Sequence, residues 1–262
     1  MMKKHFINGR KSLYYQKAGK RTVSIMKRIG LNLVLIWVVF GCRPVFEDKV
    51  QTGSVPLSVQ SGQKYVVCSY QHKSKIPDAT ILLLSSSSPE QEQWHDTAVR
   101  MAAQNYLILS IAIPSGADTS HLNQQAGAVV QAVSAYLALN YPALKWGAVG
   151  TARSAAAILS AGAKDTTMSA AALLTPEKEI DRIDSLSLRA WRERPLLLLA
   201  ATRGSRWDSL QARRFYARIA EPKKLVWLET GVDGAALLHT DMEPIIRRTI
   251  VLLFDRHLRG KR

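Results

Sequence analysis

Cysteine is scarce in this chain, since its 262 residues contain only two, Cys42 and Cys68. Two cysteines cannot build the disulfide framework of a small secreted scaffold. The 15 glycines and 10 prolines are also too few for a collagen-like repeat or a low-complexity polymer. Hydrophobic residues make up an ordinary 47%. The composition therefore indicates a globular protein, and the length suits one domain of about 200 residues plus an appendage.

The sequence also lacks the glycine-rich patterns that bind phosphate. Neither G-x-x-x-x-G-K-[ST] nor G-x-G-x-x-G occurs in it, and those loops hold phosphates through closely approaching backbone N–H groups. No cluster of His, Cys, Asp and Glu has the spacing of metal ligands. We therefore expect no cofactor and no metal.

Acidic residues are few, 20 against 36 Lys and Arg, which gives a net charge of +16. The excess lies at the two ends of the chain. Residues 1–28 carry nine basic residues and no acid, the last seven carry four, and the stretch 29–255 has a net charge of only +3. A nucleic-acid-binding domain needs a basic patch on the fold itself. We therefore expect no nucleic-acid partner.

An uncharged apolar run of thirteen residues, 29–41, follows the basic N-terminal stretch. A membrane-spanning helix needs about 20 apolar residues, and a short apolar run after a basic region is typical of a secretory signal peptide. We predict a signal peptide over residues 1–41, with Met26 as an alternative start. A buried core helix and an uncleaved membrane anchor are the other interpretations of this run.

The apolar run ends in Val39-Phe40-Gly41-Cys42, which resembles the bacterial lipoprotein box. In that box an apolar residue at −3 and a small residue at −1 precede a cysteine that is acylated, with chains such as palmitate. The resemblance implies that Cys42 is lipidated and that the protein is anchored in the bacterial cell envelope, on the periplasmic side of the inner or outer membrane. We assign residues 42–60 to a tether and 61–262 to the folded domain.

Beyond the tether, strand-like and helix-like segments alternate. Several expected strands are unbroken apolar runs, which is typical of parallel strands buried on both faces. We predict an α/β fold with a doubly wound, mostly parallel sheet and helices on both faces. The expected strands are 64–70, 79–84, 106–113, 145–149, 168–174, 195–201 and 224–229, and the expected helices are 91–104, 122–139, 153–163, 208–220 and 242–258.

Three segments resemble the α/β-hydrolase superfamily, over about residues 55–258 and without a large lid. Residues 81–86 match an apolar strand whose following loop supplies an oxyanion-hole amide. Residues 146–156 match the strand, sharp turn and helix of the G-x-S-x-G nucleophile elbow, and residues 224–234 match the last strand and the loop that carries the catalytic histidine.

In this alignment the catalytic triad of the superfamily, a nucleophile, a histidine base and an acid, is degenerate. The nucleophile position is Ala152, the base position is Asp233, and the acid position falls near Ser205 or Asp208. Ala152 has no hydroxyl, and a carboxylate with a pKa of about 3.9 is a poor base for a serine. We therefore predict a non-catalytic binding or scaffold module, whose small-molecule or protein partner the sequence does not identify. A retained pocket would be lined by Ser85, Ser86, Ala152, Arg153, Asp208 and Asp233.

A second alignment of the elbow makes the chain an active enzyme. Residues 152–156 also read small-x-Ser-x-small, with Ser154 as the nucleophile of an esterase-, amidase- or peptidase-like hydrolase. This alignment leaves Asp233 without a role. The nearest later imidazole, His239, lies six residues beyond the expected position. Both alignments remain open at the level of sequence.

Overall fold

The structure is a computed structural model of the whole chain, and it describes residues 47–58, 64–113, 119–203 and 209–261. These residues belong to one unit, Phe46–Arg262. The signal peptide, Cys42, Ser205 and Asp208 lie outside the described residues. Within the described part, no helix is both long enough and apolar enough to cross a membrane.

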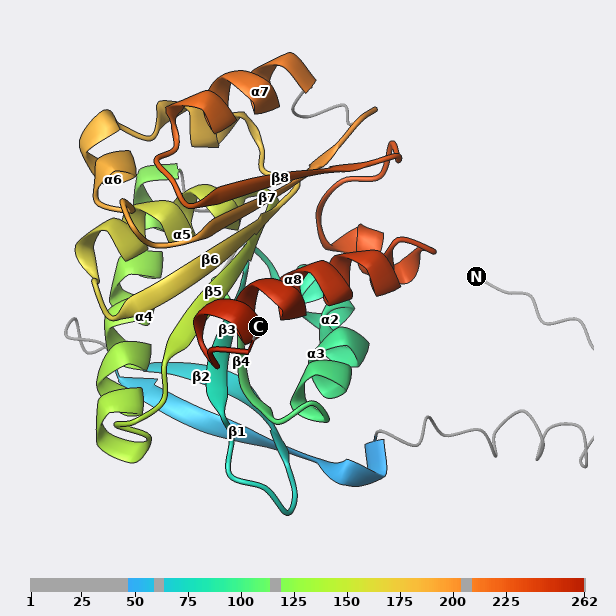
Figure 1. Cartoon of the computed structure of the whole chain (residues 1–262). Coiled ribbons are helices and arrows are strands. Elements are labelled where there is room, and N and C mark those ends of the chain that lie inside the picture. The colour runs from blue at the N-terminus through green and yellow to red at the C-terminus, as the bar shows by residue number, and fades with distance from the viewer. Residues whose placement is uncertain (1–46, 59–63, 114–118, 204–208, 262) are drawn as a thin grey trace, which may run out of the picture. The chain divides into compact units, whose positions relative to one another are not determined.

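An eight-stranded sheet forms the centre of this unit (Figure 1), in the order β1-β2-β4-β3-β5-β6-β7-β8. The pairs β1/β2 and β2/β4 are antiparallel, and all other neighbours are parallel. The strands are β1 (Val50–Ser58), β2 (Lys64–His72), β3 (Ala79–Ser85), β4 (Tyr106–Ala112), β5 (Trp146–Thr151), β6 (Met168–Leu174), β7 (Leu196–Ala201) and β8 (Lys223–Leu228).

Helices cover both faces of the sheet. One layer holds α4 (Thr119–Asn140), α5 (Ala152–Lys164), α6 (Ser185–Arg189) and α7 (Ser209–Arg218), and the other holds α2 (Ser88–Gln93), α3 (His95–Ala102) and α8 (Glu243–His257). Three short 3-10 helices complete the described elements: η1 (Glu47–Lys49), η2 (Lys178–Arg182) and η3 (Gly234–His239). The predicted doubly wound α/β class is confirmed.

The side chains explain why these layers form. Every residue of β3, β5 and β7 is buried, as expected for central parallel strands covered on both faces. Helix α5 lies close to the sheet because its inner residues are small, among them Ala155, Ala156 and Ala157, all buried. Helix α8 packs on the other face through Ile246, Ile250 and Phe254, which recur at the helical spacing of four.

Two predicted boundaries are wrong. Residues 50–58, assigned to the tether, form β1; their polar side chains fit an edge strand that pairs only with β2 and exposes most of its residues. The single helix predicted over residues 91–104 is two helices that meet at Trp94. Helix α2 buries none of its residues, whereas α3 buries five. The first helix therefore lies at the surface of the domain, and the second packs against the core.

Candidate functional site

The sheet reverses its direction of growth at β3, because β4 and β5 lie on opposite sides of it. In open parallel sheets such a switch point leaves a crevice at the carboxyl ends of the strands, where ligands bind. The loop after β3 begins at Ser86, and β5 leads into α5 at Ala152. Two of the three predicted site segments, 81–86 and 146–156, therefore meet at this crevice.

The turn from β5 into α5 has the geometry of a strained elbow. Ala152 has φ +47°, in the left-handed region that L-residues other than glycine rarely adopt. Two residues earlier, a Cβ on Gly150 would lie 2.7 Å from both the Ala155 Cα and the Ser154 carbonyl oxygen, so only glycine fits there. The side chain at the apex of this turn is a methyl group.

Two further loops close around Ala152. Gly234, with φ +69°, follows Asp233, and a Cβ on Gly234 would lie 3.9 Å from the Ala152 Cβ. The Gly234 N–H donates to Thr175 Oγ1 at 2.6 Å, and the Glu177 N–H donates to the Ala152 carbonyl at 3.4 Å. The loops after β6 and β8 are thereby held against the elbow, and Ala152 is only 6% exposed.

Ser154, the alternative nucleophile, is fully buried. Its Oγ accepts a hydrogen bond from the Thr151 N–H at 2.8 Å, and its single proton is shared between the carbonyl oxygens of Leu84 and Thr151, each 2.7 Å away. All three partners are main-chain groups at the start of α5 and the end of β3. The hydroxyl therefore fastens the helix start to the sheet, and no imidazole of the described residues is bonded to it.

Glu90 lies in the first turn of α2, just after the loop that follows β3, and sequence analysis did not single it out. One carboxylate oxygen, Oε2, accepts from the Ser86 N–H at 2.6 Å and from the Ser86 Oγ at 2.8 Å. The other, Oε1, accepts from the Thr151 hydroxyl. Glu90 thus joins the loop after β3 to the residue before the elbow. An oxyanion hole needs free amide donors in this loop, and the Ser86 amide is already bonded.

A signal for Glu90 was present in the sequence. Glu90 comes three residues after Ser87, as in the S-x-x-E pattern of helix starts. The Glu90 N–H indeed donates to Ser87 Oγ at 3.3 Å. That pattern predicts a helix cap, but the bond from Thr151 spans 61 residues and has no local signal.

The remaining predicted site residues differ in exposure. Ser85 is buried at the end of β3, whereas Ser86, Arg153 and Asp233 are half-buried around the elbow. His239 is exposed on η3. A groove of about 1220 Å³ lies elsewhere, between α8 and the first residues of β7 and β8, and no predicted pocket residue lines it.

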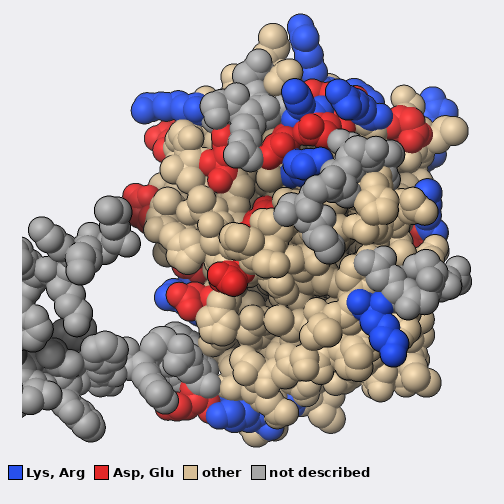
Figure 2. All heavy atoms as spheres, turned by 180° about the vertical axis from the view of Figure 1, so that it is seen from behind, with Lys and Arg blue, Asp and Glu red and all other residues tan. Residues whose placement is uncertain are grey.

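Charge is unevenly spread over the face of the molecule that Figure 2 shows. Seen from behind (Figure 2), Lys, Arg, Asp and Glu gather together at the upper end, while uncharged residues make up most of the visible middle. Within the described residues, no group of three or more His, Cys, Asp or Glu is placed to hold a metal ion.

Several solved structures have a similar arrangement of helices and strands, and esterases are among them. The esterase Pf2001 of Pyrococcus furiosus superposes with a TM-score of 0.64 at 13% identity, covering 79% of this chain and 93% of that one. A cold-adapted esterase from an Arctic intertidal metagenomic library gives 0.64 at 15%, covering 80% and 95%. The esterase domain of a Rhodothermus marinus protein gives 0.63 at 16%, covering 79% and 99%.

These likenesses establish the fold alone, because the identities are low. The domain has an α/β-hydrolase-like fold, with an eight-stranded, mostly parallel sheet and helices on both faces. No family model matches the sequence, and no curated protein matches it either.

Proposed function

We propose that this chain is a membrane-anchored bacterial lipoprotein whose α/β-hydrolase-like domain is non-catalytic and acts as a binding or scaffold module. The observation that carries the proposal is the methyl group of Ala152 at φ +47° on the elbow. Covalent acyl transfer needs a nucleophilic atom at that apex and a base within hydrogen-bond reach. Alanine supplies no such atom.

The surroundings of the elbow support the same conclusion. Gly234 lies close to Ala152, and the Ser86 N–H already donates a hydrogen bond to the carboxylate of Glu90. A tetrahedral oxyanion would have to displace that carboxylate, which repels negative charge. The residue before Gly234 is Asp233, a carboxylate where a histidine would act as the base.

The alternative is an active serine hydrolase that uses Ser154. The main-chain bonds of its buried hydroxyl argue against that role, since a nucleophile must reach the substrate. Activating Ser154 would require the first turn of α5 to detach from β3.

A fluorophosphonate probe applied to the purified full chain tests the absence of catalysis. We expect no labelling of a sample whose folding is verified by circular dichroism, under conditions in which an added esterase is labelled completely. Labelling at Ser154 that disappears in Ser154→Ala would overturn the non-catalytic proposal. A denatured sample of the same chain is the background control.

The anchor has a separate test. In bacterial cells given radiolabelled palmitate, the native chain should incorporate label and Cys42→Ala should not, and the variant should accumulate as unprocessed precursor. Cys68→Ala is the matched control, because it removes the only other cysteine and should be labelled normally. Normal labelling of Cys42→Ala would refute the lipoprotein assignment.

A further inference from the structure

Helix α8 leaves an apolar and basic stripe uncovered. Ile245 and Leu252 are large hydrophobic side chains that are 48% and 56% exposed. Arg248 and Arg256 are exposed as well, and the spacing of these four residues places them on one side of the helix. Figure 1 shows this helix, in red, running across the front of the sheet with no described element over its outer side.

The acidic residues of α8 do not offset this positive charge. Glu243 is neutralised by Arg247, at 2.9 Å, and by Arg100, at 3.6 Å. Asp255 binds Arg259 Nη1 at 2.7 Å. Arg248 and Arg256 form no ion pair with any described residue. The outward field of the helix is therefore positive.

The groove beside the last turns of α8 continues the stripe. Apolar side chains, including Leu252, Leu253 and Pro222, form part of its wall, and the basic residues Lys224, Arg256 and Lys261 also line it. Asp255 is the one carboxylate among its described lining residues, and Arg259 and Lys261 already neutralise it. His257 adds little charge at neutral pH, because burial and the neighbouring Arg256 lower its pKa.

We propose that this face of α8, together with the groove, docks on the surface of an anionic lipid bilayer. Exposed aliphatic residues flanked by unpaired Arg and Lys match the boundary between acyl chains and phosphate headgroups. A neutral protein partner would leave the basic side chains unpaired, and a polar anion would leave Ile245 and Leu252 exposed. The proposal rests on the residues of α8 and the groove, and not on lipidation or on the elbow.

The test places a photo-reactive group at the surface in question. The full chain, with p-benzoylphenylalanine in place of Leu252, is mixed with vesicles of phosphatidylcholine alone or of equal parts phosphatidylcholine and phosphatidylglycerol, and irradiated. The matched control carries the same group in place of Leu139, which is 83% exposed on α4 in the opposite helix layer.

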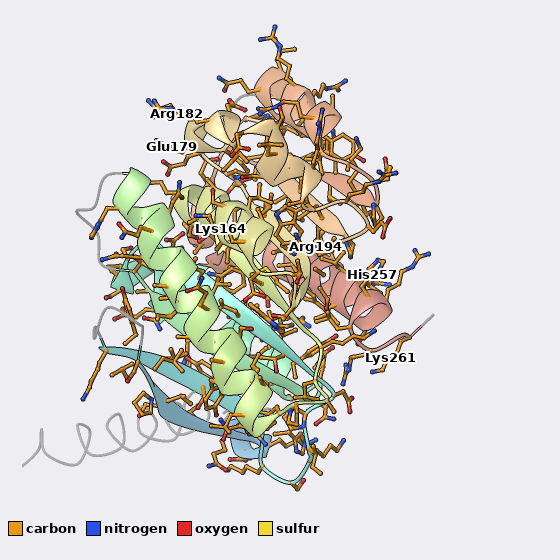
Figure 3. All side chains as sticks on the ribbon, turned by 90° about the vertical axis from the view of Figure 1, so that its left-hand side faces the viewer. Lys164, Glu179, Arg182, Arg194, His257 and Lys261 are labelled. Atoms are coloured by element: carbon orange, nitrogen blue, oxygen red, sulfur yellow. The ribbon has the colours of Figure 1, made fainter. Side chains whose placement is uncertain are left out.

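We expect lipid adducts at position 252 in the anionic vesicles, with little adduct at position 139. Reversing charge with Lys224→Glu and Arg256→Glu together should weaken binding to the anionic vesicles about 25-fold or more, and lower the adduct yield accordingly, since each basic residue near an anionic surface contributes about fivefold in affinity. Lys164→Glu is the charge control; Figure 3 shows Lys164, the last residue of α5, away from His257 at the end of α8 and from Lys261 beyond it.

Three outcomes would overturn the proposal: equal lipid adducts at positions 252 and 139, equal yields with and without phosphatidylglycerol, or adducts at position 252 with a second copy of the chain in place of lipid. None of these outcomes resembles a failure of the function proposed above, which would appear as fluorophosphonate labelling or as normal processing of Cys42→Ala.

Discussion

Two regions of this domain hold buried polar groups, and they do so in opposite ways. At the elbow, the Ser154 hydroxyl is bonded entirely to main-chain groups. At the end of the chain, the Arg259 side chain, only 4% exposed, binds Asp78 and Asp255. Ser154 is thus held by neutral hydrogen bonds to the main chain, whereas Arg259 is held by two carboxylates.

We call the second region the C-terminal ion cluster: Arg259, Asp78, Asp255 and Tyr106. The Arg259 guanidinium lies 4.3 Å from the centre of the Tyr106 ring, and the Tyr106 hydroxyl donates to Asp255 Oδ1 at 2.7 Å. Arg259 also donates to the Gln104 carbonyl at 2.8 Å. The cluster fastens the last residues to the β2–β3 loop and the start of β4.

This contrast explains how the elbow can form with alanine at its apex. Its shape is fixed by the absence of a Cβ at Gly150 and by the small helix residues behind it, and none of these depends on the side chain at the apex. Substitutions that add side-chain volume should therefore reduce the stability of the fold most at the elbow. Changes of pH should act on the C-terminal ion cluster.

The largest effect should come from Gly150→Ala. The added Cβ would meet backbone atoms at 2.7 Å, which cannot move without displacing α5, so we expect a loss of ~3 kcal/mol or more in the free energy of unfolding. Denaturant unfolding of the full chain measures it. Gly127→Ala is the matched control: nothing lies within 4 Å of its Cβ position on α4, and it should gain ~0.5–1 kcal/mol. If the two substitutions changed the free energy of unfolding equally, the close packing around Gly150 would be disproved.

Arg259→Ala should cost ~2–3 kcal/mol at pH 7, less than a fully buried ion pair because Asp78 is half exposed. Burial alone would raise the pKa of Asp255, but hydrogen bonds from Tyr106 and Arg259 outweigh it and hold that pKa below its usual range. This stabilisation is complete above the unfolded carboxyl pKa of about 4 and is lost as the pH falls through the lower folded pKa.

The free energy of unfolding should therefore be measured at pH 7 and at successively lower pH. We expect the values of the native chain and of Arg259→Ala to become equal below about pH 4. The cost of Gly150→Ala should stay constant over the same range. A pH-independent difference between native chain and Arg259→Ala would show that the cluster acts through packing alone.

Ser154→Ala should cost ~1–3 kcal/mol in the free energy of unfolding, because it removes the hydrogen bonds of a fully buried hydroxyl to the Thr151 and Leu84 main chain. Ser160→Ala, on the same helix, is the control: Ser160 is half-buried and its side chain forms no hydrogen bond in the described part. Its change should stay within ~0.5 kcal/mol. A Ser154→Ala variant as stable as the native chain would contradict the structural role of this hydroxyl.

The smallest effect should have the opposite sign. Ala152→Gly should stabilise the domain by ~1 kcal/mol, because glycine adopts φ +47° without the strain that a Cβ causes. Ala157→Gly, in the interior of the same helix, should instead cost ~1 kcal/mol or more. If both substitutions destabilise equally, Ala152 is not strained.

Much of the fold could be predicted from sequence, since unbroken apolar runs such as 79–84 and 168–174, bounded by turn residues, are typical of strands buried on both faces. The edge strand β1 was missed because its exposed polar residues resemble a linker. At the site, the segment containing Gly150 and Ala152 was identified from its small residues. Thr175 was not, because its bond to the Gly234 amide joins loops 59 residues apart.

Residue identity alone predicts a sharp turn with either Ala152 or Ser154 at its apex, and only the structure decides for Ala152, whose φ is +47°. Three other features exist only in the folded chain: the Ser154 hydroxyl faces the main chain of β3, Glu90 reaches the residue before the elbow, and two carboxylates enclose Arg259. Those contacts join residues between 61 and 181 positions apart in all but one case, the pair Asp255–Arg259. They form only when the sheet brings distant loops to the same edge, and no local pattern encodes that proximity.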